Sequence, residues 1–237
     1  MDVAKAFTYI TEDQNWLIKV GIATAIMLSS TFLLFIPLPL LIGYQLGVTR
    51  RVMTGADNPL PEWDDLGTLF MDGLSVLVAR FVYALPFIFL LCIGIGVSLL
   101  PALGGNNEDV VNALAGVTAV TWLILSCFFF ILALALLFIT PAINIQYVRT
   151  SSLGACLRIG QVLGIARRHL ADILIVMLVL FLANLALQAV VGMLAMTLCG
   201  IVLALPLAWV GGAWFSLTSG HLYGQIAAKE TSKGDLF

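Results

Sequence analysis

Three polar residues interrupt the apolar stretches of this sequence at positions where they could form a binding site. Arg80, Asn184 and Gln188 lie within long hydrophobic runs, where a polar or charged side chain is costly in lipid. Asn184 and Gln188 are four residues apart and therefore share one face of a helix. This intramembrane polar cluster could line a ligand pocket. The simpler interpretation is that the two amides form interhelical hydrogen bonds and that the long Arg80 side chain reaches the interface.

The sequence carries no residue pattern typical of catalysis. It contains no HExxH zinc motif, no GxSxG nucleophile motif, no P-loop and no Cys/His cluster. His169 and His221 have no motif that would supply a nucleophile beside them. No carboxylate lies in the centre of an apolar run, whereas proton- or sodium-coupled carriers usually place one there. We therefore predict neither an enzyme nor a coupled transporter, and no catalytic residue, cofactor or metal site.

Composition indicates that lipid surrounds most of the chain. Of its 237 residues, 61% are hydrophobic and 10% are charged, and the mean hydropathy is +1.08. Soluble domains are about half apolar and a quarter charged, so this is an integral membrane protein. The formal net charge is -2, and no basic run offers a surface for nucleic acid. The expected partner is the lipid bilayer, and nucleic acid is excluded.

Apolar runs of the length of a membrane-spanning helix, about 20 residues, occur four times. They cover 74–100, 117–140, 172–198 and 201–224. A further region, Leu17–Thr49, is too long for one crossing and contains Pro37 and Pro39, which disfavour a continuous helix. This region is either one kinked crossing or a helical hairpin with the prolines at its tip.

The distribution of basic residues favours the hairpin. Arginines follow the first region and lie between the 117–140 and 172–198 runs, while the 101–110 loop has no basic residue. By the positive-inside rule, the arginine-bearing loops and the C-terminus are cytoplasmic. If the N-terminus, with Lys5 and Lys19, is also cytoplasmic, the first region crosses twice. The predicted fold is an all-α, polytopic transmembrane helical bundle of about six segments, with five as the alternative, in which 1–237 is a single integral membrane domain.

Two stretches between the apolar runs have the pattern of amphipathic helices at the cytoplasmic interface. In the first, Pro61 suits the first helical position, acidic residues follow it, and Trp63 suits the headgroup level. The second, 152–170, is basic. We expect a charge clamp between the acids and either these arginines or the two that follow the first region; the alternative is that both charged faces are solvated. The clamp residues are Asp64, Asp65, Asp72, Arg50, Arg51, Arg158, Arg167 and Arg168.

Small residues recur at every fourth position of the last apolar run. Such a series lets another helix approach closely, which is how helices associate in lipid. We predict that this helix-packing ridge contacts a helix of the same chain, most simply the 172–198 segment; a second subunit is the alternative. The ridge comprises Ala208, Gly212, Ser216, Gly220 and Gly224.

The order of features suggests a weak parallel repeat. Segments 39–100 and 141–198 each run from a proline through a polar helix end and an interfacial stretch to a spanning helix. Identity between the two segments is slight. Parallel repeats of this kind occur in membrane transport proteins, where both copies cross in the same direction.

Short motifs in the first third of the chain carry a family resemblance. They are Gly43-Tyr44, Arg50-Arg51, Asp72-Gly73 and, most specifically, Leu60-Pro61-Glu62-Trp63-Asp64-Asp65. They resemble the signature of a family of bacterial and archaeal polytopic membrane proteins of unknown function. The resemblance implies a helical architecture in a prokaryotic plasma membrane and supplies no substrate. The chain is also distantly similar to the membrane domains attached to some glycerophosphodiester phosphodiesterases, without their soluble catalytic domain.

These observations lead to two expected functions. The first is a non-catalytic accessory, assembly or scaffold component of a membrane complex, with a membrane-protein partner or as a homo-oligomer. The alternative is passive transport of a lipid or small solute through a cavity at the broken first region, because interrupted helices often mark transport sites. The missing intramembrane carboxylate favours the first.

Overall fold

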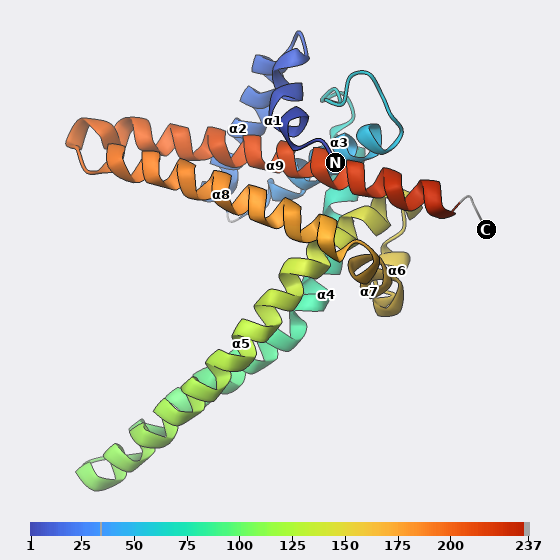
Figure 1. The fold of residues 1–237 in the computed structure, drawn as a ribbon. Helices are drawn as coiled ribbons and strands as arrows, with labels where there is room; N and C mark the ends of the chain where they lie inside the picture. Colours follow the sequence, from blue (N-terminus) through green and yellow to red (C-terminus); the bar gives the residue numbers. More distant parts are fainter. Residues whose placement is uncertain (34, 235–237) are drawn as a thin grey trace. The chain divides into compact units, whose positions relative to one another are not determined.

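The protein is built of helices, as Figure 1 shows; most connections are short, and the longest joins α3 to α4 over residues 54–65. A computed structural model describes residues 1–33 and 35–234. The elements are α1 Val3–Glu12, α2 Trp16–Phe32, α3 Leu38–Met53, α4 Leu66–Ser98, the 3-10 helix η1 Leu100–Gly104, α5 Glu108–Thr150, α6 Leu153–Cys156, α7 Ile159–Arg168, α8 Leu170–Ala195 and α9 Leu198–Gly234. The described residues contain no strand, so the all-α prediction is confirmed.

The chain forms two compact units. One comprises Met1–Ala79 and the chain from Pro141 onward, and we call it the core unit. The other comprises Arg80–Thr140, and we call it the hairpin unit. Helices α4 and α5 each contribute one end to the core unit and the other end to the hairpin unit. The single domain expected over 1–237 stays a prediction.

Several helices are long and apolar enough to cross a membrane. They are Leu66–Gly104, Glu108–Thr150, Leu170–Ala195 and Val202–Ser232. A fifth span results if α1 and α2, which meet at a bend of 105°, are counted together. The described residues therefore support four to five spans by length and composition, and the sixth segment is not among them.

The first apolar region is broken at its prolines, as predicted. Helix α2 ends at Phe32, and α3 starts at Leu38, directly after Pro37. Pro39 lies in the first turn of α3, where a helix does not use the backbone N–H that proline lacks. Between the helices, Phe35 has a φ of 66°, which residues with a side chain seldom adopt. Helices α2 and α3 contact each other.

The predicted start of the first interfacial helix is wrong. Residues 59–65 have no helical structure, and α4 begins at Leu66. Asp65 Oδ1 accepts the backbone N–H of Thr68 at 3.0 Å, as an N-cap residue does, so Pro61 is not the first helical residue. Local charge and proline placement favoured an earlier start, but the 59–65 segment bonds to other helices instead.

The second predicted interfacial helix is interrupted. The stretch 152–170 contains the short α6 and the longer α7, separated at Leu157 and Arg158. Arg158 has a ψ of 89°, which is incompatible with a continuous helix. Helix α7 buries Val162, Ile165 and Ala166, and its exposed residues include Ile159 and Leu163, so the amphipathic helix stays a prediction.

Helix α9 is the centre of the core unit. It contacts α1, α2, α3 and α8. Its Leu217 belongs to a cluster of buried side chains from several helices and from the 59–65 segment. That cluster comprises Tyr9, Ile10, Val20, Tyr44, Val48, Leu60 and Leu217.

The glycines of the predicted ridge lie mainly against α3. A Cβ at Gly220 would be 2.8 Å from the carbonyl oxygen of Gln45, and one at Gly224 would be 2.6 Å from Cβ of Val52. Gly212 instead lies against Met27 of α2. The partner of these three glycines is therefore not the 172–198 segment, which was the expected one. Steps of four residues drift by about 40° around a helix, so successive members face different neighbours.

The remaining ridge members and α8 complete this arrangement. Ala208 and Ser216 are half-buried on α9. Helix α8 meets α9 at a neighbouring position, because a Cβ at Gly211 would overlap the Leu187 side chain. Internal contact, rather than a second subunit, accounts for Gly212, Gly220 and Gly224.

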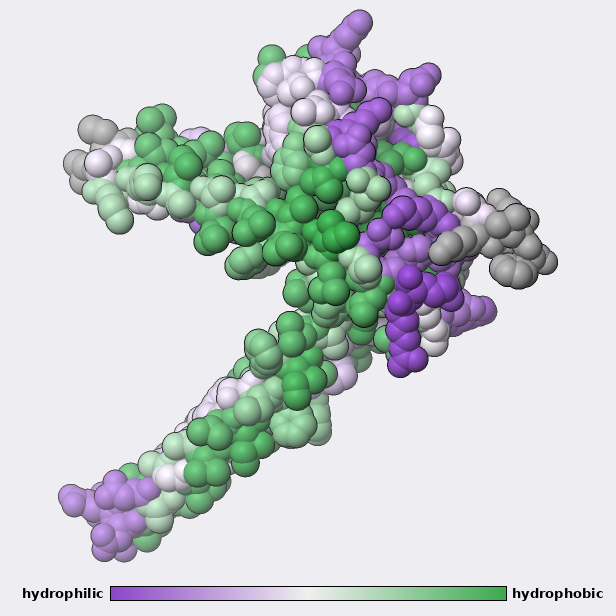
Figure 2. All heavy atoms as spheres, viewed as in Figure 1, coloured by the Kyte–Doolittle hydropathy of each residue, from purple (hydrophilic) through white to green (hydrophobic). Residues whose placement is uncertain are grey.

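The hairpin unit consists of the second part of α4, η1 and most of α5. Thr118 Oγ1 donates to the carbonyl oxygen of Val97 at 3.1 Å, and Trp122 Nε1 donates to Ser98 Oγ at 2.8 Å. Phe87 and Phe129 pack with ring centroids 4.6 Å apart. Figure 2 shows hydrophobic residues along this hairpin and hydrophilic ones at its tip.

Candidate functional site

The core unit contains a buried lysine that joins three parts of the chain. Lys19 of α2 is 2% exposed. Its Nζ lies 2.8 Å from Asp13 Oδ2 and 2.6 Å from Glu62 Oε1, and donates to the carbonyl oxygen of Leu60 at 3.4 Å. A buried ammonium is stable only when it is paired in this way. Lys19 therefore fixes the signature segment, residues 60–65, to α2 and to the α1–α2 connection.

Asp13 is the buried partner of this lysine. Its carboxylate also accepts hydrogen bonds from Asn58 Nδ2 at 2.8 Å and from the backbone N–H of Asn15 at 2.7 Å. Burial alone would raise the pKa of Asp13, but the hydrogen bonds from Lys19, Asn58 and Asn15 and the lysine charge outweigh it and lower the pKa. Asp13 precedes the apolar region that starts at Leu17, and it stays ionised near neutral pH.

The aromatic residue of the signature packs against α3. The rings of Trp63 and Tyr44 are stacked, with centroids 3.9 Å apart and an interplanar angle of 6°. The Tyr44 hydroxyl donates to the carbonyl oxygen of Pro61 at 2.8 Å, and Trp63 Nε1 donates to that of Lys19 at 3.3 Å. Arg51 Nη1 reaches the carbonyl oxygen of Leu60 at 3.0 Å. The signature is therefore a folded cap over α2 and α3.

The predicted charge clamp forms only in part. Asp72 lies 3.5 Å from Arg50 Nη2 and accepts a hydrogen bond from the Tyr147 hydroxyl at 2.9 Å. In the described part of the chain, Asp64 and Asp65 form no ion pair with an arginine. Of the predicted acids, Asp72 thus pairs with Arg50, one of the two alternative sets of partners, and not with an arginine of the 152–170 stretch.

Arginines of the second stretch have a different acidic partner. Glu230, near the end of α9, is 6% exposed and contacts Arg168. Arg149 Nη1 lies 3.4 Å from its carboxylate, and His169 Nε2 lies 2.6 Å from it. Next to them, Asp172 pairs with Lys229 at 2.8 Å. These contacts attach the end of α9 to α5, α7 and α8.

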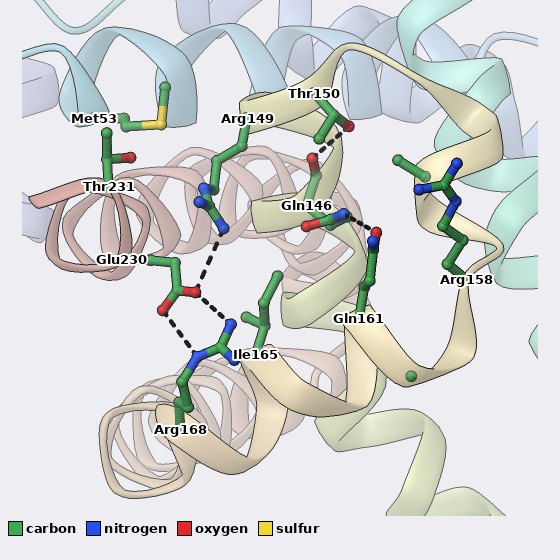
Figure 3. A pocket seen from close by; sticks show the side chains of 12 residues that line it. Met53, Gln146, Arg149, Thr150, Arg158, Gln161, Ile165, Arg168, Glu230 and Thr231 are labelled. Carbon is green, nitrogen blue, oxygen red and sulfur yellow. Dashed lines mark hydrogen bonds and ion pairs between the residues drawn. The ribbon is translucent and has the colours of Figure 1, made fainter. Parts of the chain in front are cut away.

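A cavity of about 770 Å³ opens beside Glu230, and Figure 3 shows its walls. Three arginines line it, Arg149, Arg158 and Arg168, together with the single acid Glu230. The amides of Gln146 and Gln161 also line it and are joined by a hydrogen bond of 3.0 Å. Of the residues of the predicted clamp, Arg158 and Arg168 line the cavity and Arg167 does not.

The predicted intramembrane polar residues are not brought together within one unit. Asn184 and Gln188 are exposed on α8 in the core unit, and neither has a hydrogen-bond partner in the described part of the chain. Arg80 is half-buried and begins the hairpin unit. The interhelical hydrogen bonding expected of Asn184 and Gln188 therefore stays a prediction.

Sequence reasoning missed Lys19, Asp13 and Glu230 as members of polar clusters. One signal was available for Lys19, because a lysine two residues into an apolar region is costly unless it is paired. Glu230 gave a weaker signal, since it follows the last apolar run and resembles an ordinary solvated residue. Among the described residues, no group of three His, Cys, Asp or Glu side chains could hold a metal ion.

Comparison with known proteins identifies the family. No curated protein and no solved structure matches the chain. A family model described as "Protein of unknown function (DUF4013)" matches residues 26–213, a range that includes α3, the signature segment and α8. The chain therefore belongs to the DUF4013 family of proteins of unknown function.

Proposed function

We propose that this protein is a non-catalytic integral membrane component, an accessory, assembly or scaffold subunit of a membrane complex. The observation that supports this most is how the signature segment is used. Its side chains and carbonyl groups bond to Lys19, Tyr44 and Arg51, so they hold helices in place. A motif whose polar groups bond within the protein suits a structural role better than a reaction site.

The hairpin unit supplies a surface for a partner. Within the most apolar 18-residue stretch of α5, only 6% of the residues are buried in the protein. Large side chains on both helices are open, among them Phe89 at 67% and Phe130 at 66% exposure. Lipid covers such a surface readily, and another transmembrane helix can also pack on it, because helices in lipid associate by close contact rather than by hydrophobic driving force.

The proposal includes a topology. Six segments, with α2 and α3 as a short proline-broken pair, would place both chain ends and both amphipathic stretches on the cytoplasmic side of a prokaryotic plasma membrane. Arg50 and Arg51 at the end of α3 support this orientation. Helix α3 has 16 residues, so it would cross where the membrane is locally thin. The distant similarity to glycerophosphodiester phosphodiesterase membrane domains and the parallel repeat belong to this proposal as architecture only.

A second candidate function is passive movement of a lipid or small solute. The break between α2 and α3 and the cavity beside Glu230 favour it. Interrupted helices commonly mark transport sites. Asn184 and Gln188 lend it little support, because they are exposed on α8 rather than directed into the cavity.

Photo-crosslinking in native membranes tests the proposed function. A photoreactive residue replaces Phe89 or Phe130 on the hairpin unit, and Phe181 on α8 serves as the matched control because its exposure, 64%, is similar. We expect a discrete adduct of protein mass from a hairpin position and none from Phe181. Lipid adducts alone at all three positions, together with a monomer in mild detergent, would refute the proposal and favour the transport function.

A further inference from the structure

The cavity beside Glu230 has an excess of positive charge. Its wall contains three arginine side chains and one carboxylate. The Glu230 carboxylate is 7% exposed and lies against Arg168, Arg149 and His169. It therefore orients two guanidinium groups without neutralising all of the arginine charge. An anion that enters the cavity would meet this remaining positive charge.

Arg158 is the most available cation of the cavity. It lies between α6 and α7 and is exposed, and it forms no ion pair with any residue that the structure describes. Figure 3 shows it apart from the Glu230 group, with Gln146 and Gln161 also on the wall. A guanidinium without a carboxylate partner retains its full set of donors for a ligand.

Neutral donors add to the arginines. Gly160 and Gln161 lie in the first turn of α7 and line the cavity. That end of a helix carries partial positive charge, although the backbone N–H of Gln161 already donates to the carbonyl oxygen of Arg158 at 2.9 Å. The Thr150 and Thr231 side chains also line the cavity, but their hydroxyls already donate to the carbonyl oxygens of Gln146 and Ala227. Three arginine side chains and the side-chain amides of Gln146 and Gln161 thus line one space of about 770 Å³, which is large enough for a polar headgroup.

We propose that this cavity binds a phosphate-bearing anion, with Arg158 as a direct ligand and Arg149 and Arg168 as ligands oriented by Glu230. Arginine forks match the oxygen geometry of phosphate, and several of them around one cavity suit its multiple oxygens better than a single carboxylate. The group can come from an anionic phospholipid or from a small soluble phosphate ester. This binding is independent of the scaffold function proposed above.

The test measures binding to the purified full chain in a neutral, lipid-free detergent. Glycerol 3-phosphate is titrated in one series, and phosphatidylglycerol in mixed micelles in another, with phosphatidylcholine as the lipid control. The readouts are the thermal midpoint and the dissociation constant. In Arg158→Gln we expect affinity to fall about tenfold, the loss typical of one charged hydrogen bond. Arg167→Gln is the matched control, because Arg167 is exposed on α7 but does not line the cavity.

The two series distinguish the source of the phosphate. A saturable response to glycerol 3-phosphate identifies a soluble ligand, and a response to phosphatidylglycerol alone identifies a lipid headgroup. No saturable response in either series would overturn the proposal, as would equal losses in Arg158→Gln and Arg167→Gln. Such a failure leaves the scaffold function standing, because the crosslinking experiment probes the hairpin unit and not this cavity.

Discussion

Replacing Lys19 with methionine tests whether the buried lysine holds the signature cap. The substitution keeps a side chain of similar length but removes the ammonium that joins Asp13, Glu62 and the Leu60 carbonyl oxygen. Asp13 then stays buried without its cation. Asn58 and the Asn15 N–H still donate to it, but neither carries a compensating charge.

The expected magnitude follows from the burial of each partner. The side chains of Lys19 and Asp13 are each 3% exposed, and breaking a buried pair by removing one partner costs about 3–5 kcal/mol. Glu62 is 54% exposed, so its pair with Lys19 is worth about 0–1 kcal/mol. Lys19→Met should therefore destabilise the protein far more than Glu62→Gln. The double variant Lys19→Met/Asp13→Leu should recover much of the loss, because it leaves no buried charge.

The assay is unfolding of the purified chain in mild detergent, followed by helical circular dichroism, with the wild type and the three variants in the same micelles. The order expected is wild type, Glu62→Gln, the double variant and then Lys19→Met, from most to least stable. Equal stability of Lys19→Met and Glu62→Gln would refute the reasoning. So would a double variant that is less stable than Lys19→Met, since that result would mean that Asp13 stabilises the fold without the lysine.

Three further predictions concern the crossing of α3 and α4, the stability of the protein at low pH, and the membrane topology. Gly73→Ala should cost several kcal/mol, because its Cβ would overlap the carbonyl oxygen of Pro39, whereas Gly96→Ala on the same helix should be neutral or stabilise by about 0.5–1 kcal/mol; unfolding of both variants measures this. The pKa of Asp13 lies below its ordinary value of 3.8, so the stability that its ionised carboxylate contributes is complete above about pH 4 and is lost as the pH falls through the lowered pKa. In Asp13→Asn, the thermal midpoint of unfolding should therefore fall less below about pH 4 than in the wild type. A cysteine at Val3, in a chain without its native cysteines, should react with an impermeant reagent only after the membrane is opened; labelling of intact cells would leave five spans.

The long apolar helices could be predicted because lipid leaves such a segment few options. A segment in the bilayer must satisfy its backbone internally, so a long apolar run becomes a helix whatever its neighbours are. The break at Pro37 and Pro39 was predictable for the same local reason, since a missing N–H and a restricted preceding residue act within one turn. Both features depend on residues close together in sequence.

The polar clusters could not be predicted because their members are far apart in sequence. Lys19 and Glu62 are 43 positions apart, and the periodicity of the sequence does not indicate that they meet. Residues 59–65 have the composition of a helix start, but Tyr44 and Arg51 bond to their carbonyl groups, and those tertiary bonds hold the segment outside a helix. Likewise, nothing in the local pattern near Glu230 indicates that Arg149 and Arg168 lie beside it.

The pairs Gly43-Tyr44 and Asp72-Gly73 are explained by one helix crossing. A Cβ at Gly43 would overlap the carbonyl oxygen of Leu69, so α3 and α4 are in backbone contact there. Adjacent residues on a helix point about 100° apart, so a glycine at the crossing leaves its neighbour directed elsewhere.

Tyr44 and Asp72, the residues next to these two glycines, each contact another segment of the chain. Tyr44 stacks on Trp63 of the signature cap, while Asp72 meets Arg50 of α3 and Tyr147 of α5. The closeness of the helices therefore sets the position of both polar contacts. A bulkier residue at Gly43 should weaken the Asp72 contacts as well as the crossing, and Asp72→Asn combined with Gly43→Ala should cost less than the sum of the two single changes.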